Sequence, residues 1–241
     1  MRSRFRRSQM LTEPELRALW RLRLSLISLK PTVSEEQDFV AFQKDFVWPG
    51  WVWSLHDGDA VVGFFLQRGA PILYQGKKIL ALLPEYGFLA PAHRGRPVVP
   101  LASVVITALV MLAAPLAPKL VAASTYPPGY VAFRQVIRPF WTLGAPGLPA
   151  WERGLLLHLA ERVSGASFEP KDGTVTMRTL PFPPKEPGSD ETRRLYAAYV
   201  AENPRWREGR GLFFMFPVSA WVLARVVLHA GRRWLKGLRR R

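Results

Sequence analysis

Near the start of the chain, polar and apolar residues alternate with the spacing of a helix. Thr12 and Glu15 form a capping box, in which each side chain can bond the backbone N–H of the other residue. Behind this box, apolar side chains from Leu16 onward recur on one face. The pattern predicts a helix that runs to about Leu29 and ends before Pro31.

A second capping signature and then a strand pattern follow. Ser34 with Gln37 predicts another helix, which continues through Phe46. Apolar and aromatic residues over 51–55 and 60–66 flank an Asp-Gly turn, which tolerates the positive φ that tight hairpins require. We therefore expect two helices and a β-hairpin in this part of the chain.

The rest of the chain combines short apolar strands with further helices. Residues 97–114 carry no charge and predict a buried helix, and Pro84 can interrupt the longer strand that precedes it. Together the elements predict a mixed α/β domain. The remaining expected elements are strands at 78–83, 86–89, 120–124, 166–169, 174–178 and 211–216, helices at 130–137, 151–163 and 190–201, and a terminal helix from Val218 onward.

Positive charge is concentrated at the two ends. The formal net charge is +16 over 241 residues, and residues 1–7 and 212–241 hold eleven basic residues and no acidic one. The body between them is therefore only mildly basic. Basic clusters of this kind indicate a partner that carries phosphate, either a lipid headgroup or nucleic acid.

Cysteine is absent and histidine is scarce. Without cysteine the chain can form no disulfide, no thiolate metal site and no cysteine nucleophile. Its four histidines show no close metal-ligand spacing, so we expect no metal cofactor. Acidic residues interrupt any apolar run behind the N-terminal arginines, which predicts that there is no secretory signal and that the protein is cytoplasmic.

The segment 86–96, YGFLAPAHRGR, leads from a strand through an Arg/Gly turn into a helix. With the order helix, helix, hairpin, third strand, helix, short strand, helix, it resembles the GNAT superfamily of N-acyltransferases over residues 12–141. The resemblance implies a mixed central sheet flanked by helices, with acetyl-CoA or another acyl-CoA as co-substrate. In that superfamily the turn and the N-terminus of the next helix bind the pyrophosphate through backbone N–H groups.

The resemblance implies a cofactor site in this turn. Arg94, Gly95 and Arg96 would bind the pyrophosphate of acyl-CoA. Pro97 and Val99 stand where the superfamily's motif has further glycines, so the two arginine side chains would carry more of the binding.

The same resemblance implies two catalytic residues. Glu85 would take a proton from the attacking amine, with His93 as a weaker candidate. Tyr130 would protonate the departing thiolate, and we prefer it narrowly over Tyr126 on the preceding loop. Each of these side chains also has a structural interpretation, as an exposed carboxylate at a strand edge or as a packing phenol.

The C-terminal stretch is apolar and then strongly basic. Pro217 and Arg225 interrupt an apolar run that would otherwise be long enough to span a membrane. We therefore expect residues 219–241 to form an amphipathic helix on an anionic membrane surface, and the alternative is that residues 221–228 pack on the domain. The expected apolar face comprises Trp221, Val222, Leu228, Leu235 and Leu238.

These patterns divide the chain into a basic arm (1–10), an acyltransferase-like domain (11–217) and the terminal helix (218–241). The leading hypothesis is an N-acyltransferase that transfers an acyl group to a small-molecule or lipid amine at the inner face of a membrane. A non-catalytic, membrane-bound interaction module of the same shape is the alternative. Nucleic acid is the least favoured partner, because only the net charge supports it.

Overall fold

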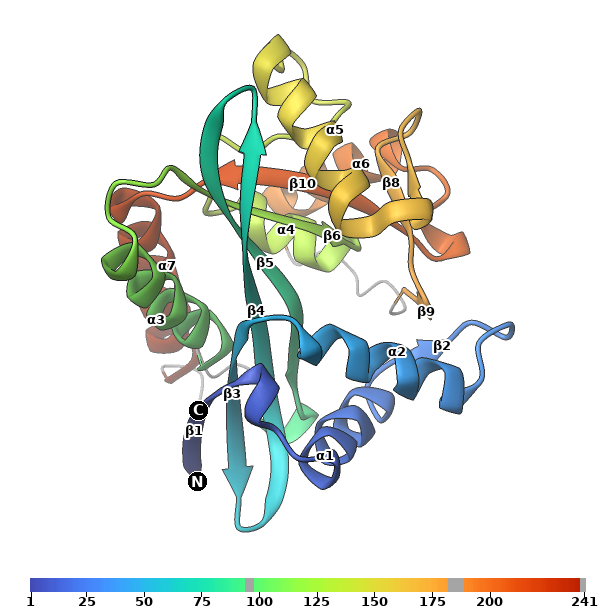
Figure 1. The fold of residues 1–241 in the computed structure, drawn as a ribbon, viewed down its shortest axis with the longest axis vertical. Coiled ribbons are helices and arrows are strands. Elements are labelled where there is room, and N and C mark those ends of the chain that lie inside the picture. The colour runs from blue at the N-terminus through green and yellow to red at the C-terminus, as the bar shows by residue number, and fades with distance from the viewer. Residues whose placement is uncertain (94–97, 182–188, 239–241) are drawn as a thin grey trace.

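An eight-stranded mixed sheet forms the centre of the protein (Figure 1) in a computed structural model that describes residues 1–93, 98–181 and 189–238. Neighbouring strands are antiparallel except β5 and β6, which are parallel. The predicted mixed α/β class, a mixed sheet flanked by helices, is confirmed. In spatial order the strands are β1 (Arg2–Arg7), β3 (Gly50–Asp57), β4 (Ala60–Tyr74), β5 (Lys77–Leu89), β6 (Lys119–Thr125), β10 (Arg210–Pro217), β8 (Thr174–Thr176) and β7 (Phe168–Glu169).

Helices cover both faces of this sheet. In the described residues they are α1 (Glu13–Leu24), α2 (Glu35–Val47), α3 (Val98–Ala113), α4 (Pro127–Arg134), α5 (Ala150–Ser164), α6 (Asp190–Glu202) and α7 (Ala220–Leu238). Along β4, Phe64 packs with α1 and α2, whereas the adjacent Phe65 packs with α3. Along β10, Phe213 packs with α5, whereas Phe214 packs with α4 and α6. Successive side chains of a strand point to opposite faces of the sheet. Helices α1 and α2 therefore lie on the opposite face from α3, and α5 lies on the opposite face from α4 and α6.

Both predicted capping boxes are present. The Ser34 N–H donates to Gln37 Oε1 at 3.0 Å, and the Gln37 N–H donates to Ser34 Oγ at 3.2 Å. The Thr12 N–H donates to the Glu15 carboxylate at 3.0 Å. These local bonds explain why both helices begin where the sequence predicted.

The first helix is shorter than predicted. It ends at Leu24 instead of near Leu29, because the following residues form β2 (Ser28–Leu29). This strand pairs with β9 (Thr179–Leu180) in a separate two-stranded sheet. The partner strand lies in the C-terminal half of the chain, so this pairing ties the N-terminal helices to that half.

The segment predicted as a basic arm, residues 1–10, is mostly strand β1. It runs antiparallel to β3 along the edge of the sheet. The Arg7 guanidinium lies 3.8 Å from the centre of the Trp51 ring, and Arg6 pairs with Glu15 at 2.6 Å. Charged side chains suit an edge strand, because they discourage pairing with another chain. The arginine-rich sequence thus belongs to an edge strand.

A buried ion pair joins α1 to α2. The Asp38 carboxylate, which is inaccessible to solvent, accepts a hydrogen bond from Trp20 Nε1 at 2.9 Å and two from the guanidinium of Arg23. Arg178, which precedes β9, lies 3.4 Å from the same carboxylate. Buried charges are tolerated only when they are paired. Asp38 therefore fixes three segments relative to one another.

We expect Asp38→Asn to lower the free energy of unfolding by about 3–5 kcal/mol, because the buried Arg23 would lose its countercharge. Urea denaturation followed by circular dichroism measures the loss. Glu13→Gln is the matched control, since Glu13 pairs with Arg17 on the exposed side of α1, where ion pairs contribute little. Equal losses in the two variants would contradict the structural importance of the buried pair.

Candidate active site

Strands β5 and β6 begin as parallel neighbours and then part. Their register joins Leu80 to Lys119 and Leu82 to Val121; farther along, β5 stays paired with β4, and β6 stays paired with β10. Figure 1 shows β5 continuing down the sheet while β6 turns across it. Within the described residues, no strand pairs with this edge of β5 beyond Leu82. The backbone groups of that edge can therefore bond a ligand.

A β-bulge lies just past this point. Leu66 of β4 pairs with Tyr86 and the adjacent Gln67 pairs with Pro84, so Glu85 is an extra residue in β5. Pro84 does not interrupt the strand, as the sequence had suggested it could. It lies beside the bulge, where its missing N–H is tolerated. The bulge re-aims the side chain of Glu85.

Glu85 forms an ion pair with Arg68 of β4. Arg68 Nε donates to Glu85 Oε1 at 2.9 Å, and a second guanidinium nitrogen donates to the same oxygen. The two side chains are 14% and 22% exposed, so Glu85 is not a freely exposed edge carboxylate. Burial raises the pKa of Glu85, the charge of Arg68 opposes this rise, and the nearby Asp45 carboxylate adds to it. Glu85 is thus a stronger base than an ordinary glutamate.

Tyr86 and Arg178 extend this cluster toward α2. The Tyr86 hydroxyl donates to Asp45 Oδ2 at 2.5 Å and accepts a hydrogen bond from Arg178 at 2.9 Å. Arg178 also lies 3.2 Å from Asp45. Burial raises the pKa of Tyr86 well above its ordinary value, and Asp45 adds to the rise. The sequence analysis assigned no role to Asp45, Tyr86 or Arg178. Asp45 and Arg178 belong to distant segments, and Tyr86 entered only as the first residue of the segment 86–96.

Tyr126 lies close to this cluster. It directly follows β6 and precedes α4. Its hydroxyl donates to the Thr179 carbonyl at 2.5 Å, and Thr179 is the residue after Arg178. Burial raises the pKa of Tyr126 to about 12. The phenol therefore keeps its proton throughout the physiological range.

Tyr130, the preferred catalytic tyrosine, lies in a different environment. It is 4% exposed, and its ring packs edge-on against Phe140 and Tyr199. Burial raises its pKa, and the neighbouring Arg134 opposes the rise. Its contacts share no residue with those of Glu85, so the structure does not bring the two predicted catalytic residues together.

The predicted pyrophosphate residues Arg94, Gly95 and Arg96 lie outside the described residues, as does Pro97. Just before them, His93 ends a short 3-10 helix, and its Nδ1 is buried without a hydrogen-bond partner in the described structure. In the parts of the chain that the structure describes, no group of three or more histidine and carboxylate side chains is placed to hold a metal.

Val99 can be placed, and its side chain faces the sheet. Its Cγ1 lies 3.4 Å from the position that a Cβ on Gly87 would occupy. It also packs with the cluster of Trp53, Phe65 and Ile106. The bulk of Val99 is therefore accommodated between α3 and β5.

The terminal helix α7 packs on the domain through one side. Val222 is 6% exposed, and Val226 joins the same apolar cluster. The prediction that Val222 belongs to the membrane-facing side is therefore wrong, whereas Trp221 and Leu228 remain exposed. The side chains of Leu235 and Leu238 lie outside the described ones. None of the helices in the described residues is long and apolar enough to cross a membrane.

No protein-family profile and no curated protein matches the chain. One similar solved structure is an Enterococcus faecalis protein of unknown function described as a probable N-acyltransferase, with 13% identity and a TM-score of 0.40. The match covers 59% of this chain and 33% of that one, so the chain spans about a third of its length.

Two further similar structures come from other bacteria. An acyl-CoA N-acyltransferase from Pseudomonas aeruginosa has 15% identity and a TM-score of 0.37, with 51% of this chain and 79% of that one covered. Escherichia coli ElaA has 14% identity and a TM-score of 0.42, with coverages of 60% and 89%. N-acyltransferases are thus among the structures that the chain is similar to. Similarities of this size assign neither family membership nor activity.

Proposed function

We propose that this protein is an N-acyltransferase that transfers an acyl group from acyl-CoA to an amine. The observation that carries the proposal is the parting of β5 and β6 after Leu82 and Val121. The pantetheine arm of CoA contains amides, and amides can pair with a free strand edge as a peptide does. The free edge of β5 would receive that arm, with Glu85 at the adjacent bulge.

The start of α3 suits the pyrophosphate of the same ligand. This helix begins at Val98, two residues after Arg96, with Pro97 between them. The N-terminus of a helix attracts phosphate through its free N–H groups and its dipole. Because the Val99 side chain turns toward Gly87, its bulk is directed away from such a ligand.

In the proposed reaction the amine nitrogen attacks the thioester carbonyl, so that a carbon–nitrogen bond forms and the carbon–sulfur bond breaks. Glu85 would take the proton that the nitrogen loses, a role that its raised pKa favours. A phenol would give its proton to the departing thiolate and regain one from water. We assign this role to Tyr126 instead of Tyr130, because Tyr126 adjoins the Arg178 cluster.

Acyl-CoA binding and turnover test this proposal. We expect acetyl- or palmitoyl-CoA to give a binding isotherm in titration calorimetry, and we expect a panel of polyamines, amino sugars and ethanolamine to include an acceptor. Because the protein contains no cysteine, a thiol reagent reports released CoA without background from the protein. No binding heat with either ligand at high micromolar concentration would overturn the proposal.

Glu85→Gln should lower the rate of CoA release about 10²- to 10⁴-fold while acyl-CoA binding persists, because the base is lost but the strand edge remains. The carboxylate of Glu85 must be ionised to accept a proton, and its pKa is raised above the ordinary value of 4.5. The wild-type rate should therefore increase as the pH rises past this raised pKa. The variant should lack this rise. Glu36→Gln, on the exposed side of α2, is the control that should keep it.

We further infer that the enzyme works at an anionic membrane surface. The charge-free helix α3 leaves Leu101, Val105, Leu109 and Leu112 exposed at helical spacing. Figure 1 shows α7 alongside α3, and α7 adds the exposed Trp221. Exposed apolar surfaces of this extent mark interaction sites.

The charge beside this surface favours anionic lipid as the partner. From Leu212 to the end of the chain, basic residues occur without any acidic one. Each basic residue near an anionic surface contributes about 1 kcal/mol to binding. The leucine side chains would enter the acyl boundary while the basic residues contact headgroups, as in interfacial helices.

Vesicle flotation tests this inference. We expect binding to vesicles that contain phosphatidylserine and little binding to phosphatidylcholine alone. Leu109→Glu/Leu112→Glu should weaken binding at least about tenfold, since inserting one leucine contributes about 1.5–3 kcal/mol. Leu73→Glu, near the end of β4, is the control, because the exposure of Leu73 lies between those of Leu109 and Leu112. Equal flotation of all three proteins on both vesicles would exclude this surface as the docking site.

A further inference from the structure

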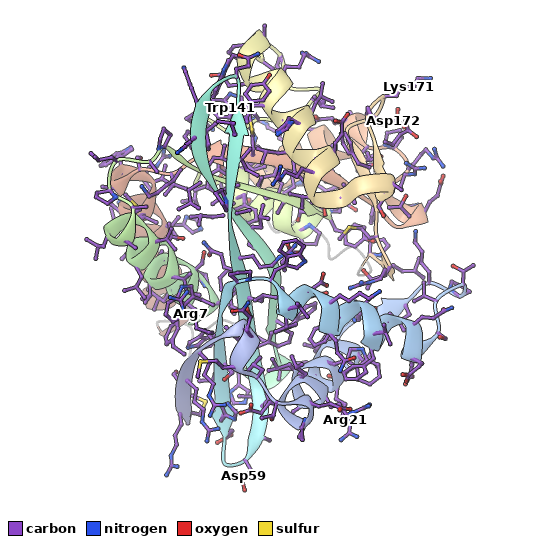
Figure 2. The ribbon with its side chains drawn as sticks, viewed as in Figure 1. Arg7, Arg21, Asp59, Trp141, Lys171 and Asp172 are labelled. Carbon is purple, nitrogen blue, oxygen red and sulfur yellow. The ribbon has the colours of Figure 1, made fainter. Side chains whose placement is uncertain are left out.

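A large cavity lies outside the candidate active site. Its volume is about 990 Å³, and its lining comes from α4, the segment 140–146, α5, the β7–β8 turn and the end of α6. Figure 2 shows Lys171 and Asp172, on that turn, at the end of the molecule that carries α5, opposite to the end with Asp59. Neither Glu85 nor Tyr126 lines the cavity.

Two residues that line the cavity each have a buried side-chain atom without a hydrogen-bond partner in the described structure. Asn203 is 1% exposed, and its Nδ2 donates to the Tyr199 hydroxyl at 3.1 Å and to the Arg210 carbonyl at 3.0 Å. These two bonds fix the orientation of the amide, so its Oδ1 is an acceptor without a donor. Arg134 Nε is likewise a buried donor without an acceptor. Unsatisfied buried groups are costly, which points to a missing ligand.

Charge in the cavity is predominantly positive. The cations Arg134, Arg153 and Lys171 outnumber the carboxylates of Asp172 and Glu202, whereas Arg205, which also lines the cavity, pairs with Glu208 at 2.9 Å. The Glu202 carboxylate accepts a hydrogen bond from the Gly144 N–H at 3.0 Å, which fixes its position. Arg134, Arg153 and Lys171 belong to α4, α5 and the β7–β8 turn, so positive charge reaches the cavity from three segments.

We propose that this cavity binds a small organic phosphate that carries free hydroxyl groups, such as a sugar phosphate. The phosphate would accept a hydrogen bond from Arg134 Nε, and its tetrahedral oxygens suit cations that approach from several directions better than a planar carboxylate does. A hydroxyl of the ligand would donate to Asn203 Oδ1. Apolar side chains such as Phe140 and Leu157 would contact the carbon skeleton.

Titration calorimetry with glucose 6-phosphate tests the site, with glucose and inorganic phosphate as the two partial ligands. We expect glucose 6-phosphate to bind more tightly than inorganic phosphate, because only the sugar can satisfy Asn203, and we expect no binding of glucose. Arg134→Gln should weaken glucose 6-phosphate about 10- to 100-fold, since it removes a charge-assisted hydrogen bond.

Two surface variants keep the test independent of folding. Arg153→Glu/Lys171→Glu changes exposed residues at the mouth of the cavity and should weaken glucose 6-phosphate about tenfold or more. Arg162→Glu, an exposed residue of the same helix α5 that does not line the cavity, should have no effect. Binding that is equal in all variants, or equal for glucose and glucose 6-phosphate, would overturn the proposal.

Discussion

The arrangement of the candidate active site depends on the buried contacts of the Asp38 carboxylate. It is buried on α2, accepts hydrogen bonds from Trp20 and Arg23 of α1, and forms an ion pair with Arg178 of the C-terminal half. Arg178 in turn contacts Asp45 and Tyr86, and the next residue begins β9, which pairs with β2. One buried charge thus holds the C-terminal half against the helices at the place where β5 and β6 have parted.

The free edge of β5 is acceptable only because other parts of the fold compensate for it. A sheet that opens at its centre loses ladder hydrogen bonds, and it would also expose apolar side chains. Here the rings of Phe42, Phe46 and Phe64 surround Tyr86 on the α2 side, while α3 covers Phe65 on the other face. The edge is therefore open along the backbone while both faces of the strand remain packed. This combination suits a long, thin ligand.

Features encoded by neighbouring residues could be predicted from the sequence, and features encoded by distant ones could not. The capping boxes at Thr12 and Ser34, the Asp-Gly hairpin and the charge-free helix α3 each depend on a few adjacent residues, and all are present. The prediction that this helix is buried is wrong for one side of it, which leaves four apolar side chains exposed. The edge strand β1, the two-residue pairing of β2 with β9 and the contact of Arg178 with Asp38 join distant segments. The two candidate tyrosines are only one helical turn apart, so only tertiary packing could distinguish their environments.

The bulge explains why two adjacent residues of β5 can serve one site. In a regular strand Glu85 and Tyr86 would point to opposite faces of the sheet. The extra residue re-aims Glu85, so that it pairs with Arg68 and its pKa responds to Asp45 and Arg178, the same charges that contact the Tyr86 hydroxyl. The basicity of Glu85 is thus set by burial together with charges from α2, β4 and the C-terminal half. A change in the position of Arg178 would alter both the pairing of the two halves and the proton affinity at the bulge, because the same guanidinium contributes to both.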